Sequence, residues 1–129
     1  MGDEKLAYQC QKALHGETEV VTDLNALEVK GLISTAYLVV TSRFHGVASA
    51  LNSCVPCLAT SWSHKYAELF HDYKLNDCIL PLDNFETSIA MVDKYLEERE
   101  NKKIRDLLSR QVPRIQNETR EMWKDVWNV

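Results

Sequence analysis

Short apolar runs that alternate with helix-like segments place the strongest constraint on the fold of this chain. The run at residues 37–41 (YLVVT) is apolar throughout and bounded by polar residues, which is typical of a strand buried on both faces of a sheet. A second run, at residues 56–60, begins with a proline, and a strand tolerates the missing amide donor there. Residues 19–22 and 78–80 predict two further short strands.

Helix-like segments fill the intervals between these strands. Apolar residues recur at helical spacing in four of them, at residues 3–14, 26–33, 44–52 and 64–73. Asn25 is a suitable cap for the second. A helical pattern resumes at residue 86, Pro113 is expected to end or bend it, and residues 114–129 predict a terminal helix. The predicted fold is therefore α/β, a Rossmann-like parallel sheet of about four strands with helices on both faces.

The length of 129 residues fits a single domain, so we expect one Rossmann-like domain over residues 1–129. The chain starts abruptly at Met1-Gly2 and enters a charged helical pattern at once. A four-stranded sheet is also small for this fold class. Both features predict that the chain is the carboxy-terminal part of a longer, two-domain protein.

Net charge and cysteine content exclude several classes of function. A formal charge of -4 gives no net basic field for nucleic acid or anionic lipid, and no segment is long and apolar enough to span a bilayer. The four cysteines are Cys10, Cys54, Cys57 and Cys78, and three lie in or beside apolar runs, which favours buried thiols and a cytoplasmic location. The Cys54–Cys57 pair follows a helix and precedes a strand, whereas a redox motif follows a strand and opens a helix. A zinc site would need a second pair of ligands, and no such pair has the usual spacing.

Ligands of open parallel sheets gather in the loops that follow the strands. Two of the four predicted loops, Asp23-Leu24-Asn25 and Asp83-Asn84, carry acidic and amide side chains. The other two, Ser42-Arg43-Phe44-His45-Gly46 and Ser61-Trp62-Ser63-His64-Lys65, each place a cation beside a histidine.

The first of these two loops places Arg43 at the start of a helix, where free amides and the helix dipole already favour an anion. The guanidinium can bind a carboxylate or phosphate with two hydrogen bonds, and His45 could converge on the same ligand. The alternative is that Arg43 pairs with a nearby carboxylate and His45 packs under the sheet edge. In the second loop Ser61 or Ser63 can cap the next helix and Lys65 can contact a phosphate. Its alternative is a plain helix start with a solvent-facing lysine.

The Ser42–Gly46 segment, the apolar helix after it and Val55-Pro56 at the next strand resemble the core motif of the polysaccharide pyruvyl transferases. Residues 61–66 with Glu68 are similar to a further segment of that family, so the resemblance spans roughly residues 20–82. Tyr37 and Cys54 depart from the family pattern, where aspartate and glycine are common.

The resemblance implies a bacterial enzyme of exopolysaccharide biosynthesis with the two-domain architecture of GT-B glycosyltransferases. Such an enzyme transfers a pyruvyl ketal from phosphoenolpyruvate to a sugar of a cell-surface polysaccharide. The resemblance also implies that Arg43 and His45 are donor-binding and catalytic residues. We add Ser42, Ser63, His64 and Lys65 to the residues expected to bind the donor. Phosphoenolpyruvate is a substrate, and no cofactor or metal is expected.

On this interpretation Arg43 stabilises the leaving phosphate or the carboxylate, and His45 binds the anion or moves a proton. The acceptor site is expected on a missing amino-terminal domain, so this chain alone should be inactive. An apolar face around Trp123 and Trp127 could drive self-association.

Two other functions remain open from the sequence. A sugar-nucleotide glycosyltransferase or epimerase domain of the same architecture would bind its nucleotide at the same loops. A non-catalytic α/β interaction module would need an acidic cluster at the strand ends, for which Asp23 and Asp83 are thin support.

Overall fold

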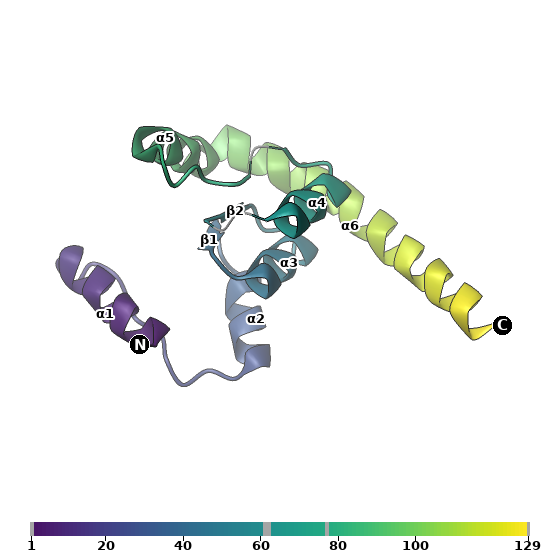
Figure 1. Cartoon of the computed structure of the whole chain (residues 1–129), viewed down its shortest axis with the longest axis horizontal. Coiled ribbons are helices and arrows are strands. Elements are labelled where there is room, and N and C mark those ends of the chain that lie inside the picture. The colour runs from purple at the N-terminus through teal and green to yellow at the C-terminus, as the bar shows by residue number, and fades with distance from the viewer. Residues whose placement is uncertain (1, 61–62, 77, 129) are drawn as a thin grey trace.

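The computed structural model describes residues 2–60, 63–76 and 78–128 of the chain. These residues form six helices and two strands (Figure 1). In chain order the elements are α1 (Asp3–Ala13), α2 (Ala26–Ser34), β1 (Val39–Thr41), α3 (Phe44–Asn52), β2 (Cys57–Ala59), α4 (His64–Asp72), α5 (Phe85–Leu96) and α6 (Glu98–Trp127).

The sheet corrects the predicted fold class. β1 and β2 pair in parallel, with Val39 opposite Cys57 and Thr41 opposite Ala59, and they form a two-stranded sheet. Residues 19–22 form no strand, and residues 78–80 contribute one isolated bridge, between Ile79 and Ala59. The prediction of a four-stranded Rossmann-like sheet covered on both faces was therefore wrong for the described residues, which are mostly helical.

The physical reason is that a strand of three residues depends on its neighbours. Residues 19–22 lie in the connection between α1 and α2, and Val21 there is 48% exposed, so this segment gains little by pairing. Within the described sheet β1 pairs with β2 on one side, and its central residue, Val40, is 47% exposed. The expectation that residues 37–41 are buried on both faces is thus also wrong.

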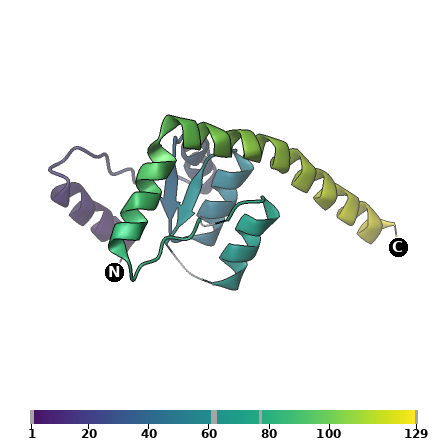
Figure 2. The same cartoon turned by 90° about the horizontal axis from the view of Figure 1, so that it is seen from above.

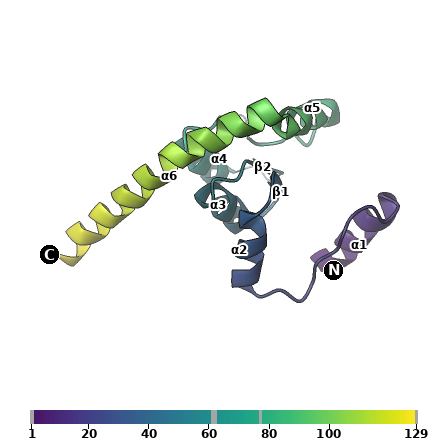
Figure 3. The ribbon, with the colours of Figure 1, turned by 180° about the vertical axis from the view of Figure 1, so that it is seen from behind.

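The core is built from α3, β2, α4 and α6. The apolar face of α3 contributes Val47, Ala50 and Leu51, all fully buried, and contacts both strands and α6. Figures 1 and 3 show α5 and α6 passing along one side of the two strands, with α2 and α3 on the other. By contrast α1 has no buried residue, and most of it lies away from this body (Figure 3).

A buried asparagine joins α6 to the segment before β1. Asn101 is 1% exposed, and its amide donates to the main-chain oxygens of Tyr37 and Tyr95, each at 3.0 Å. Its own oxygen accepts from Arg105 Nε at 2.7 Å, while Arg105 Nη2 also donates to Tyr37 O at 2.7 Å. Each polar atom of the Asn101 side chain thus has a partner, as its burial requires.

Pro113 does not end α6, which runs through it for 30 residues. The proline is exposed, so the carbonyl that loses its helical partner can face water. Val112 beside it is buried and Ile115 is packed against the core, which holds the turns on either side. Residues 114–129 were predicted as a separate terminal helix, whereas residues 114–127 are the last part of α6.

Beyond the core, α6 projects away from the body (Figure 2). Trp123 and Trp127 stack there with ring centroids 6.5 Å apart and are 49% and 79% exposed. Self-association through this face stays a prediction. No helix in the described part of the chain combines the length and the apolar composition that crossing a bilayer requires.

Candidate functional site

The loops after β1 and β2 lie at one edge of the sheet because the two strands are parallel. The amide of Thr60 donates to the carbonyl of Thr41 at 3.0 Å, which carries the strand pairing up to the point where both loops begin. This neighbourhood is what the sequence predicted for residues 42–46 and 63–65. Ser61 and Trp62, which belong to the second predicted segment, lie outside the described residues.

A tight turn leads from β1 into α3. The hydroxyl of Thr41 accepts a hydrogen bond from the amide of Arg43 at 3.1 Å, and Arg43 is the residue that precedes the helix. A β-carbon on Gly46 would lie 2.8 Å from Thr41 Oγ1, closer than side chains normally approach. Glycine at position 46 therefore lets the first turn of α3 pack directly against the end of β1.

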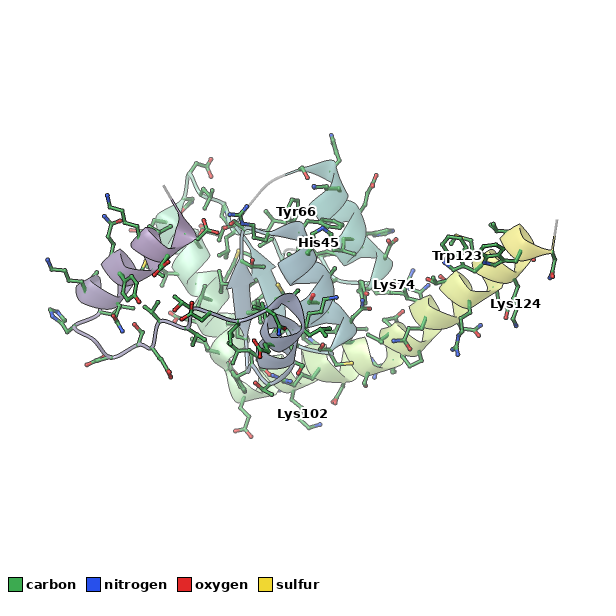
Figure 4. All side chains as sticks on the ribbon, turned by 90° about the horizontal axis from the view of Figure 1, so that it is seen from below. His45, Tyr66, Lys74, Lys102, Trp123 and Lys124 are labelled. Atoms are coloured by element: carbon green, nitrogen blue, oxygen red, sulfur yellow. The ribbon has the colours of Figure 1, made fainter. Side chains whose placement is uncertain are left out.

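Tyr66 ties the start of α4 to this turn. Its phenol donates to the main-chain oxygen of Ser42 at 2.9 Å, and its ring meets Phe44 edge-on with centroids 5.6 Å apart. Lys65 Nζ lies 5.0 Å from the centre of the Phe44 ring, a cation–π distance. We call residues 42–46 and 63–66 the two-loop cluster; Figure 4 shows two of its members, His45 and Tyr66, on the adjacent helices α3 and α4.

Arg43 has a carboxylate partner in this structure. Its Nη2 lies 2.6 Å from Asp3 Oδ2, although both side chains are largely exposed, at 70% and 82%. Pairing with a nearby carboxylate was the alternative role considered for Arg43. His45 is exposed, with its ring 6.0 Å from that of Phe44, so it does not pack under the sheet edge.

The start of α4 differs from the capping prediction. Ser63 precedes the helix but its side chain makes no capping hydrogen bond, and its buried Oγ has no partner among the described residues. His64 and Lys65 occupy the first turn, and both are exposed. The cluster thus has four exposed side chains that carry or can carry positive charge, Arg43, His45, His64 and Lys65, and one polar atom that is shielded from water, Ser63 Oγ.

The two acidic loops lie elsewhere. Asn25 caps α2 as predicted, accepting from the amide of Glu28 at 2.9 Å while Glu28 Oε2 accepts from the Asn25 amide. Asp23 lies in the connection before it with a φ of 61°. Asp83 follows the isolated bridge and lines a cavity.

That cavity was missed by the sequence analysis. It measures about 690 Å³ and is lined by Thr60, Ala67, Phe70, Leu75, Asn76, Cys78, Ile79, Leu80, Pro81, Leu82 and Asp83. We call it the sheet-edge cavity because Thr60 directly follows β2. Most of its lining residues are apolar, and no spacing pattern in the sequence signals a hollow beside α4. Arg43 and His45 do not line it.

The two cysteines of the Cys54-Val55-Pro56-Cys57 segment have a structural role and not a reactive one. Cys54 follows α3 with a φ of 59°, and Cys57 lies in β2 at 1% exposure. Burial raises the pKa of the Cys57 thiol to about 12, with a further contribution from Cys78, and burial also raises the pKa of Cys54. Neither thiol is therefore poised to ionise as a nucleophile near neutral pH.

Residues 2–64 match the model of a protein family described as polysaccharide pyruvyl transferase. This part of the chain is therefore similar to that family. The predicted resemblance is confirmed, and the matched region includes Ser42, Arg43, His45, Ser63 and His64 but ends before Lys65. The match supports the general function, that of a transferase. Searches found no match among curated proteins or solved structures.

Proposed function

We propose that this chain carries the donor-binding part of a polysaccharide pyruvyl transferase, with phosphoenolpyruvate as donor and a sugar as acceptor. The observation that carries the proposal is the link between the two loops, where Tyr66 bonds to Ser42 and Lys65 lies over Phe44. Through this link Lys65, from the second loop, lies near the first loop, which carries Arg43 and His45.

The donor needs several anchors because it carries both a phosphate and a carboxylate. Arg43 can bind either group through two parallel hydrogen bonds, and the contact of its guanidinium with Asp3 is the kind of contact that a donor carboxylate would make. Lys65 adds a point charge at the neighbouring helix start. The exposed position of both side chains leaves them accessible to a ligand.

The reaction would proceed as a ketal formation. Two sugar hydroxyl oxygens form bonds to the central carbon of phosphoenolpyruvate, the bond from this carbon to the phosphate oxygen breaks, and phosphate leaves. Of the two hydroxyl protons, one ends on the methylene carbon, which becomes a methyl group, and the other ends on the phosphate. Arg43 would stabilise the charge on the departing phosphate, and His45 would hold or move a proton. The cytoplasmic location and the absence of activity in this chain alone belong to the same proposal.

Calorimetric titration of the chain with phosphoenolpyruvate tests the proposal. Arg43→Ala should weaken binding by about tenfold or more, as loss of a hydrogen bond to a charged group does, while Arg110→Ala, at an exposed position of α6, should not. His45→Ala should also weaken binding, whereas the control His71→Ala, in the last turn of α4, should not. Binding of a nucleotide sugar with no response to phosphoenolpyruvate would overturn the proposal.

A further inference from the structure

The sheet-edge cavity lies beside the two-loop cluster. Thr60, in its wall, bonds to Thr41 at the end of β1, and the Thr41 hydroxyl in turn holds the Arg43 amide. α4 belongs to both features, since Lys65 lies in its first turn whereas Ala67 and Phe70 line the cavity. A ligand in the cavity would therefore lie next to an anion held by the cluster.

The size and lining of the cavity indicate a small neutral ligand. Its volume of about 690 Å³ is within the usual range for ligand pockets, about 300–1,000 Å³. Phe70 and Leu80, at 2% and 7% exposure, form a buried apolar wall of the cavity. Leu82, also in the lining, is 75% exposed and is therefore accessible from solvent. None of the described residues that line it is a lysine, arginine or histidine, so these residues offer no positive charge to a phosphate or carboxylate.

Three polar residues complete the lining, Thr60, Asn76 and Asp83. A hydroxyl, an amide and a carboxylate can accept hydrogen bonds from ligand hydroxyls, and the amide can also donate. Apolar surface together with a few acceptors fits a ligand that has an apolar face of C–H groups and several hydroxyl groups. A sugar ring has this combination.

We propose that the sheet-edge cavity is a subsite for a neutral sugar ring of the acceptor. The inference rests on the proposed function, which supplies a sugar as the second substrate. Asp83 and Asn76 orient the hydroxyls, and the wall formed by Phe70 and Leu80 packs against the ring. The acceptor site predicted for a separate domain thus has one wall on this chain, adjacent to the donor-binding cluster.

Nuclear magnetic resonance of the 129-residue chain tests this inference. The probes are the methyl glycosides of glucose, galactose and mannose, added separately, with uridine and octanol as a nucleoside and a lipid-like control. We expect at least one glycoside to shift the amide signals of Leu75, Ile79 and Leu82 in a saturable manner. Phosphoenolpyruvate, added in a separate titration, should instead shift signals of the two-loop cluster.

Two substitutions give the test a structural control. Ala67→Trp places a large ring in the cavity and should abolish the glycoside response, whereas Ala90→Trp, at an exposed position of α5, should leave it unchanged. Asp83→Asn keeps the shape but removes the charge, and it should weaken glycoside binding by about tenfold. The matched control is Glu86→Gln, in the first turn of α5.

The outcomes separate this inference from the proposed function. If no glycoside shifts the cavity signals, or if Ala67→Trp and Ala90→Trp respond alike, the subsite is wrong even when phosphoenolpyruvate binds the cluster. A response to uridine or octanol without a response to any glycoside overturns it in favour of a nucleoside or lipid site. A glycoside response with no phosphoenolpyruvate response would support the sugar site and contradict the proposed donor.

Discussion

Arg43 and Asp3 form an ion pair of 2.6 Å between the start of α3 and the first turn of α1. If Arg43 binds the donor, the Asp3 carboxylate competes with the donor for the same guanidinium. Asp3→Asn should then lower the dissociation constant for phosphoenolpyruvate by about two- to fivefold, the ratio that an exposed ion pair represents. Calorimetry at low salt measures this change.

The control for this substitution is Glu4→Gln, which removes the same charge from the neighbouring position of α1. It should change donor affinity less than Asp3→Asn does. The advantage of Asp3→Asn should also shrink as salt is raised, because the pair is exposed and screened. Equal effects of both variants would mean that Asp3 acts through the general field of α1 and does not compete for Arg43.

The hydrogen bond from Tyr66 to Ser42 gives a second prediction. Tyr66→Phe keeps the ring against Phe44 and removes the bond that joins the two loops. We expect donor affinity to fall by about two- to tenfold, which corresponds to the roughly 0.5–1.5 kcal/mol of one such bond. Tyr8→Phe, on exposed α1, should leave donor affinity unchanged. Unchanged affinity in Tyr66→Phe would show that the donor does not need the two loops joined.

Two glycines in helices should respond to alanine with opposite signs. Gly46→Ala brings a β-carbon to 2.8 Å from Thr41 Oγ1, and overpacking of this kind costs about 1–3 kcal/mol of unfolding free energy. Gly31→Ala, within α2, meets nothing within 4 Å and should raise stability by about 0.5–1 kcal/mol. Urea denaturation of both variants measures the difference, and a neutral Gly46→Ala would contradict the tight packing of α3 on β1.

Local signals in the sequence predicted helices α1 to α4 well, but they missed the division between α5 and α6 at Glu97. Asn25 caps α2 with Glu28 as its reciprocal partner, and such a cap depends on residues three apart in the chain. The neighbourhood of residues 42–46 and 63–65 was also predictable, because the ends of parallel strands meet at one edge. The contacts of Tyr66 with Ser42 and with the Phe44 ring were not predictable. Ser42 and Tyr66 are 24 positions apart, and no local pattern links positions so distant in the sequence.

The sheet was overestimated for a related reason. Short segments with two to four consecutive apolar residues were taken as strands. A strand is stabilised by its partner, however, and the sequence does not state whether residues 19–22 have one. Likewise Pro113 was expected to end or bend a helix, yet its exposed position and the buried Val112 beside it allow α6 to continue. The partner of Arg43, Asp3, is 40 positions away, beyond the reach of any local pattern.

Asn101 should be among the most sensitive polar residues for stability. Asn101→Ala leaves the carbonyls of Tyr37 and Tyr95 without this donor and Arg105 Nε without its acceptor. Burial of such unpaired groups should lower the unfolding free energy by about 3 kcal/mol. Asn117→Ala, at an exposed position of the same helix, should change it by less than about 0.5 kcal/mol. A similar small change in both variants would contradict the role of Asn101 in joining α6 to the segment before β1.

Cys57 predicts how stability depends on pH in the alkaline range. Burial raises the pKa of its thiol from 9.0 to about 12, so between these values the unfolded chain loses a proton that the folded chain keeps. The unfolded state is then favoured progressively as pH rises, by about 1.4 kcal/mol at pH 10 relative to pH 8 from this group. Cys57→Ala lacks this group and therefore escapes this loss. The difference in unfolding free energy between the unsubstituted chain and Cys57→Ala should be smaller at pH 10 than at pH 8 by that amount. Urea denaturation at both pH values measures these differences, and the control Cys10→Ala, at an exposed position, should match the unsubstituted chain at both. If the difference in unfolding free energy between Cys57→Ala and the unsubstituted chain does not change with pH, the thiol ionises as readily in the folded chain as in the unfolded one.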